Sequence, residues 1–172
     1  MIFMSQSGIA DPAQEASWAE WYVEHLRIMR TVDGIDSAQR FKTLNPDWPP
    51  SLAMYSIRSP EVFQDPYYQK IRGMGPWLER IDKKFYRRNL FDRAHGVEPV
   101  FPPVVDADSA LIVVDREQPD ADIGSVSSSV SFLWLKTVGL DHSTPYRGIR
   151  VLSQQEAVAL PLRPEFAVYL PD

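Results

Sequence analysis

Apolar and polar positions at the start of the chain predict a buried strand followed by an amphipathic helix. Residues 2–6, IFMSQ, carry apolar side chains at both odd and even positions, which is typical of a strand buried on both faces. A helix is expected next, because Asp11 suits the N-cap and Pro12 suits the first helical position. Gly34 is expected to end this segment.

The same pattern predicts two strands over 37–44 and 51–57, a helix over 59–72 and a strand over 85–91. The resulting order, β-α-β-β-α-β, is that of a ferredoxin-like α+β domain, assigned to residues 1–96. Such a domain places both helices on one face of a four-stranded antiparallel sheet. Because the first strand is apolar on both faces, a second sheet is expected on the other face, most simply from another copy of the chain.

Residues 97–172 form a different, β-rich segment that begins with a proline-containing linker. Four strands are expected in it, over 109–115, 132–140, 148–152 and 166–170. Acidic and then serine-rich residues over 117–131 predict a flexible loop, and Ser153 begins a capping box. We interpret the segment as a C-terminal extension or as a shrunken second ferredoxin-like unit, although the long helix after its first strand is missing and no firm internal repeat is evident.

Composition excludes several classes of function. The 172 residues include no cysteine, so disulfides, thiolate metal sites and cysteine catalysis are excluded, and a cytoplasmic location is expected. A formal net charge of −5 argues against general nucleic-acid binding, which needs a basic surface. No secretory leader is evident, and no stretch reaches the roughly 18–20 apolar residues of a membrane helix, so no membrane partner is expected.

The histidines are too dispersed along the chain to predict a metal site. His25, His95 and His142 show none of the short spacings of metal-binding motifs. The glycines form no phosphate loop, and the GxSxG motif of hydrolases is absent. We therefore expect neither a metal nor a cofactor.

The first candidate site is one stripe of the predicted first helix, formed by Trp18, Tyr22, His25 and Met29 at spacings of four, three and four. Aromatic residues in such a stripe are most often core residues. An imidazole in an apolar stripe instead needs a hydrogen-bond partner or a cavity with water, and it can move protons near neutral pH. Both interpretations stay open, with Trp18 and Met29 assigned to the core and Tyr22 and His25 to a possible pocket.

The second candidate is the glycine-bounded segment GLDHSTPYRG, residues 139–148. Its residues Asp141 and His142 can hold an acid or base, and Arg147 can bind a carboxylate. The alternative is an ordinary polar turn, since Asp, Ser, Thr and Pro are good turn residues. The basic and aromatic segment FYRRNLFDR, residues 85–93, resembles a nucleic-acid contact, but a solvated strand face with inward aromatics fits an acidic chain better.

Several segments together resemble a known superfamily. They are WAEWYVEHL in the first helix, the short strand YSI, and the later segments SPEVFQDPYY and PWLERIDKKFYRR. This set is similar to the dimeric α+β barrel superfamily, and in particular to its EthD-like branch, over about residues 1–92. One departure is Arg27, which stands where a proline usually follows EHL in that branch.

The resemblance implies a barrel formed by homodimerisation, with a cavity between the helices and the sheet of each subunit. Members of the superfamily include cofactor-free monooxygenases, cyclases, isomerases, EthD-type proteins and haem enzymes. Carried over by residue, the helix motif implies that Trp21, Tyr22 and His25 line or border the cavity.

These observations lead to three hypotheses about function. The first is a cofactor-independent lyase or isomerase that acts on a small aromatic or oxygenated ring metabolite by acid–base chemistry. The second is a non-catalytic protein that binds such a small molecule, and the third is a haem protein. The expected catalytic residues are His25, Tyr22, His142 and Asp141. The expected substrate-binding residues are Trp21, Tyr55, Trp77, Tyr146 and Arg147.

Overall fold

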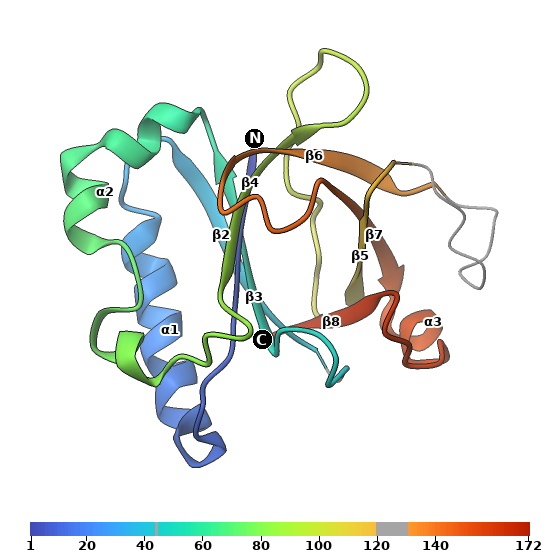
Figure 1. Cartoon of the computed structure of the whole chain (residues 1–172), viewed down its shortest axis with the longest axis horizontal. Helices are drawn as coiled ribbons and strands as arrows, with labels where there is room; N and C mark the ends of the chain where they lie inside the picture. The colour runs from blue at the N-terminus through green and yellow to red at the C-terminus, as the bar shows by residue number, and fades with distance from the viewer. Residues whose placement is uncertain (44, 120–130) are drawn as a thin grey trace.

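Eight antiparallel strands form a closed barrel in the computed structural model, which describes residues 1–43, 45–119 and 131–172 (Figure 1). The order of the strands around the barrel is β1-β3-β2-β8-β5-β7-β6-β4. The strands are β1 (Ile2–Ser7), β2 (Ile35–Thr43), β3 (Ser51–Ile57), β4 (Arg87–Arg93), β5 (Ser109–Arg116), β6 (Leu133–Leu140), β7 (Tyr146–Ser153) and β8 (Ala167–Pro171). All eight predicted strands are therefore present, with bounds shifted by a few residues.

The helices lie outside the barrel, most of them against the first four strands (Figure 1). They are η1 (Pro12–Gln14), α1 (Glu15–Met29), η2 (Pro60–Gln64), α2 (Pro66–Ile71), η3 (Gly75–Arg80) and α3 (Gln154–Val158). Asp11 caps the first turn by accepting a hydrogen bond from the backbone N–H of Ala13 at 3.0 Å. The single helix predicted over 59–72 is wrong, because Pro66 divides it into two short helices and the Asp65 carboxylate caps the second one.

The chain closes its own barrel, so the predicted ferredoxin-like α+β domain that completes a barrel by dimerisation is wrong. The resemblance to the EthD-like dimeric α+β barrels fails for the same reason. Strands β2 and β4 are the two edges of the first four-stranded sheet. Strand β8 pairs with β2 and β6 pairs with β4, so residues 97–172 satisfy the hydrogen bonds of both edges.

The interior of the barrel explains why the first strand is apolar on both faces. Ile2 and Met4 point inward, where they pack with residues of the second half such as Leu111, Val113 and Ile149. Phe3 points outward and packs beneath α1. The cover expected from a second copy of the chain is thus supplied by β5–β8. The predicted homodimer is not needed to close the barrel and stays a prediction.

The two halves of the chain repeat one strand order, although the sequence shows no firm internal repeat. The first half runs β4-β1-β3-β2 across its sheet, and the second runs β8-β5-β7-β6. The predicted domain boundary, between residues 96 and 97, falls in the connection from β4 to β5. The flexible loop predicted over 117–131 falls mainly on residues 120–130, which lie outside the described residues.

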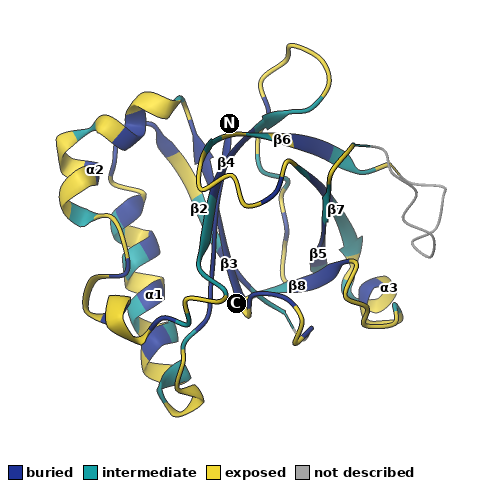
Figure 2. Cartoon of the chain, in the orientation of Figure 1, coloured by how far each residue is buried: buried dark blue, intermediate teal, exposed yellow. Residues whose placement is uncertain are grey.

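Burial follows the layers of the fold. Figure 2 shows that α1 is buried along the side facing the sheet and exposed along the opposite side. The buried residues of α1 are Trp18, Tyr22, Leu26 and Met29, at the spacing expected of an amphipathic helix. Over the described parts of the chain, no helix has the length and apolar character needed to cross a membrane.

Candidate functional site

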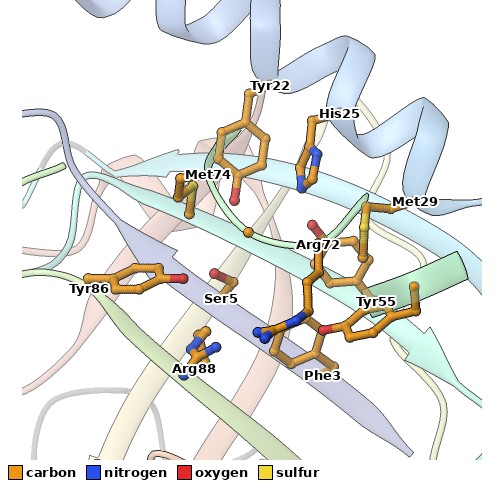
Figure 3. A pocket seen from close by; sticks show the side chains of 12 residues that line it. Phe3, Ser5, Tyr22, His25, Met29, Tyr55, Arg72, Met74, Tyr86 and Arg88 are labelled. Atoms are coloured by element: carbon orange, nitrogen blue, oxygen red, sulfur yellow. The ribbon is translucent and has the colours of Figure 1, made fainter. Parts of the chain in front are cut away.

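A cavity lies between α1 and the outer face of strands β1, β3 and β4 (Figure 3). Its volume is about 30 Å³, which is room for one or two water molecules. The residues that line it are Phe3, Ser5, Tyr22, His25, Met29, Tyr55, Tyr68, Arg72, Gly73, Met74, Tyr86 and Arg88. Three residues predicted from the sequence, Tyr22, His25 and Tyr55, are therefore brought together here.

His25 enters this cavity from α1, beside the buried stripe. Figure 3 shows its ring and the Tyr22 hydroxyl pointing from the helix toward Ser5 on β1. The indole of Trp21 stacks on the His25 ring, with ring centroids 4.8 Å apart and planes 11° apart. Burial lowers the pKa of His25 to about 4, because the charged imidazolium is poorly solvated there. The ring is consequently neutral at pH 7.

Four tyrosines line the cavity together with His25, and burial keeps three of their hydroxyls protonated. Burial raises the pKa of Tyr22, while the charge of Arg40 opposes this rise. Burial also raises the pKa of Tyr55 well above its usual value. The pKa of Tyr68 is raised by burial too, against the opposing charges of Arg72 and Arg88. These phenols are therefore hydrogen-bond donors at any physiological pH.

The Arg88 side chain reaches the cavity from β4 and is held by a turn of the second half of the chain. Its Nη2 donates to Oδ1 of Asp141 at 2.9 Å, and its backbone N–H donates to Oδ2 at 2.9 Å. The backbone N–H of Asp141 in turn donates to the carbonyl of Arg88 at 2.8 Å. Leu140 and His142, on either side of Asp141, both have positive φ, at 71° and 47°. Non-glycine residues rarely adopt this conformation, so the backbone is strained where it presents Asp141.

Arg72 reaches the cavity from the C-terminal end of α2, where the chain continues as Gly73, Met74 and Gly75. Its Nε donates to Oε1 of Gln69 at 2.7 Å. Gly73 and Gly75 have φ values of 90° and 47°, a conformation that favours glycine. A Cβ atom at Gly73 would meet no atom within 4 Å, so this part of the wall is loosely packed.

Arg40 packs against the rings of Trp18 and Tyr22 and is almost completely buried. Its guanidinium carbon is 4.7 Å from the ring centroids of both Trp18 and Tyr22, a cation–π arrangement. Its charge is balanced, since Nη1 lies 2.7 Å from the carboxylate of Asp172 and Nη2 lies 3.5 Å from that of Glu15. Arg40 therefore supports the helix–sheet contact from within and does not line the cavity.

The second predicted site, residues 139–148, is divided among three places. Asp141 contacts Arg88, as described above, and His142 is exposed on the same turn. Tyr146 packs against the outer face of the second half of the barrel. Arg147 points into the barrel, where it binds the carboxylate of Asp115. Of the residues predicted in this segment, only Asp141 therefore contacts a residue that lines the cavity.

Trp77 is buried in the cluster between helices and sheet and does not line the cavity.

Five polar residues that line the cavity were not predicted from the sequence, namely Ser5, Tyr68, Arg72, Tyr86 and Arg88. The segment FYRRNLFDR did contain a signal, since its interleaved rings and guanidiniums supply Tyr86 and Arg88. The same pattern predicts a strand face, and most of the segment does lie in strand β4.

Within the described residues, no group of three or more histidines and carboxylates is close enough together to hold a metal ion. Comparison with known protein families, curated proteins and solved structures gives no match to this chain.

Proposed function

We propose that the cavity beneath α1 is the site of a cofactor-independent acid–base enzyme, a lyase or isomerase acting on a small oxygenated or aromatic ring metabolite. The observation that carries the proposal is the convergence of one neutral imidazole and four phenols on one cavity. The part of the chain that the structure describes contributes no carboxylate to its lining. Such a set can accept one proton and donate several hydrogen bonds to a developing oxyanion.

His25 is the group that takes the proton in this proposal. A neutral imidazole is in the correct form to remove a proton from a carbon next to a carbonyl group. With a pKa of about 4 it is a weak base in the free protein. A negative charge forming on the substrate raises that pKa, because an adjacent anion stabilises the imidazolium. Proton transfer and enolate formation therefore assist each other.

The tyrosine hydroxyls stabilise the enolate. Tyr22 and Tyr55 face the same space as His25, and their raised pKa values keep them protonated as donors. Hydrogen bonds to a developing oxyanion in a poorly solvated site contribute about 3 kcal/mol each to transition-state stabilisation. Return of the proton from His25 to another carbon or to a leaving group then gives isomerisation or elimination.

The size of the cavity sets a condition on this chemistry. At about 30 Å³ it is too small for a whole ring, so the ring occupies the mouth or displaces part of the wall. The segment from Arg72 to Gly75 is the part of the wall suited to move, because its two glycines have positive φ and Gly73 is free of close neighbours.

The second candidate is a protein that binds the metabolite without converting it. The low pKa of His25 favours this alternative, because a weak base removes protons slowly unless the ligand raises its basicity.

We retain the cytoplasm as the proposed location. The homodimer stays a prediction.

Proton exchange in D₂O separates the two candidates. Wild-type protein is incubated with small cyclic ketones and lactones, and loss of the α-proton signal is followed by NMR. The enzyme proposal expects accelerated exchange that falls about 100-fold or more in His25→Gln. His142→Gln is the matched control and is expected to keep the full rate, because His142 is exposed and lies outside the cavity lining. Saturable binding without exchange would support the binding protein, and neither binding nor exchange would exclude both candidates.

A further inference from the structure

The charges around the cavity do not balance. Among the described residues, its lining contains two arginines, Arg72 and Arg88, and no acidic residue. Asp141 neutralises Arg88, with Nη2 and Nε lying 2.9 and 3.4 Å from its carboxylate oxygens. Arg72 makes a hydrogen bond to the neutral amide of Gln69 and has no carboxylate within ion-pair distance among the described residues. The cavity therefore carries one uncompensated positive charge in a chain whose net charge is −5.

The two buried arginines, Arg40 and Arg147, do not offer such a charge. Arg147, the residue expected from the sequence to bind a carboxylate, is already paired with Asp115 and lies inside the barrel. Arg40 is paired with Asp172 and Glu15. Arg72 differs from both because it is exposed and lines the cavity together with Tyr55 and Phe3 (Figure 3).

Arg72, Arg88 and Tyr68 all line the same cavity. The positive charges of both guanidiniums lower the pKa of Tyr68, against the larger effect of burial. Two guanidiniums and a phenol at one opening supply donors of the type that binds a carboxylate. Asp141 engages the Nε and Nη2 of Arg88, and no hydrogen bond to a described residue occupies its Nη1, which remains for a ligand.

We propose that the substrate is a monocarboxylate, whose carboxylate is bound at the cavity mouth by Arg72 with Arg88 beside it, while its ring or carbonyl faces His25 and the tyrosines. This inference rests on the proposed function of the cavity and names the class of its substrate. A single negative charge matches the single uncompensated positive charge. A dianion would leave one carboxylate without a partner, and an amine would be repelled.

Three related probes test this inference with the full-length protein. They are 3-oxocyclohexane-1-carboxylate, its neutral carboxamide and unsubstituted cyclohexanone, which present the same cyclic ketone with and without the charge. Dissociation constants are measured by NMR titration at low salt. We expect the carboxylate to bind at least tenfold more tightly than the carboxamide, and we expect this preference to shrink as ionic strength rises.

Variants assign the preference to one residue. Arg72→Gln is expected to remove the preference for the carboxylate while leaving the affinity for the carboxamide within about twofold. Arg72→Lys is expected to keep part of the preference for the carboxylate, because lysine retains the positive charge but lacks the planar guanidinium that binds a carboxylate through two hydrogen bonds. Arg58→Gln is the control, since Arg58 is an exposed arginine paired with Asp33 and outside the cavity lining. It is expected to keep the full preference.

The outcomes distinguish this inference from the proposed function. Equal binding of carboxylate and carboxamide, with exchange of the ketone α-protons intact, would overturn the monocarboxylate and leave the enzyme proposal standing. An equal loss of affinity for both probes in Arg72→Gln would show that Arg72 only shapes the wall, and would also overturn it. Failure of all three probes to bind or exchange would overturn both.

Discussion

Arg147 and Asp115 form a bidentate ion pair inside the barrel, with Nε–Oδ1 and Nη2–Oδ2 distances of 2.7 and 2.8 Å. The arginine side chain is completely buried, and Nη2 also donates to the amide oxygen of Gln6 at 2.8 Å. The two residues lie opposite each other on β7 and β5. Their pairing explains how a cation fits into an apolar barrel interior, since a buried charge is tolerated only when it is paired and hydrogen-bonded.

Removing one member of this pair is expected to destabilise the fold. In Asp115→Ala the buried guanidinium loses its counter-charge, and we expect a loss of about 3 kcal/mol in the free energy of unfolding, measured by urea denaturation. Asp33→Ala, which breaks the exposed pair with Arg58, is the control and is expected to change stability little. The double variant Asp115→Leu with Arg147→Met removes both charges and is expected to recover most of the loss. A double variant as unstable as Asp115→Ala would contradict this account.

Acid sensitivity should depend on His25. Burial lowers its pKa in the folded protein to about 4, compared with 6.5 in the unfolded chain. Between these values the unfolded state binds more protons, so stability is full above pH 6.5 and is lost as the pH falls toward 4. The expected loss is about 3 kcal/mol. The free energy of unfolding of wild type and His25→Gln is measured by urea denaturation at pH 4, 5 and 7. We expect the stability difference between the two proteins to change steadily as the pH falls, because only wild type carries the buried imidazole. His142→Gln is the control and is expected to show the same pH dependence as wild type. Parallel pH profiles for wild type and His25→Gln would refute the shift.

Gly148 fits a position on β7 that has no room for a side chain. A Cβ atom there would lie 2.8 Å from Cγ2 of Val114 and 3.0 Å from Cδ1 of Phe132. Gly148→Ala is therefore expected to destabilise the protein by about 1–3 kcal/mol in thermal or urea unfolding. Gly139→Ala on β6 is the matched control, because its nearest contact would be an ordinary 3.6 Å to Leu90. Equal effects at both glycines would rule out the steric explanation.

The strain in the turn that presents Asp141 should be relievable. His142 has a φ of 47° and an exposed side chain, so glycine suits its backbone better. We expect His142→Gly to raise the free energy of unfolding by about 0.5–1 kcal/mol. Lys136→Gly is the control, because Lys136 is exposed on β6 and does not have a positive φ. This substitution is expected to lower the free energy of unfolding. A destabilised His142→Gly would mean that the side chain supports the turn. This change should leave the proposed activity intact, in contrast to His25→Gln.

Part of the candidate site was predictable because it depends on local periodicity. The spacing of Trp18, Tyr22 and His25 placed them on one side of a helix, and that side does face the sheet. Arg72 and Arg88 could not be found in this way. They come from α2 and β4, and only the packing of both elements around α1 brings them to one opening.

The sequence by itself determined the local elements, because alternation, caps, prolines and glycines act within a few residues. It predicted all eight strands, the first helix and the short helix after Ser153. Tertiary structure alone decided how the strands pair. The edges of β2 and β4 are satisfied by β8 and β6, from more than 40 residues further along the chain, and no local pattern encodes that choice. The same long-range pairing decided part of the site, because closing the barrel turned Arg147 inward and brought Asp141 to Arg88. Among the described residues, Arg72 then has no carboxylate partner at the cavity.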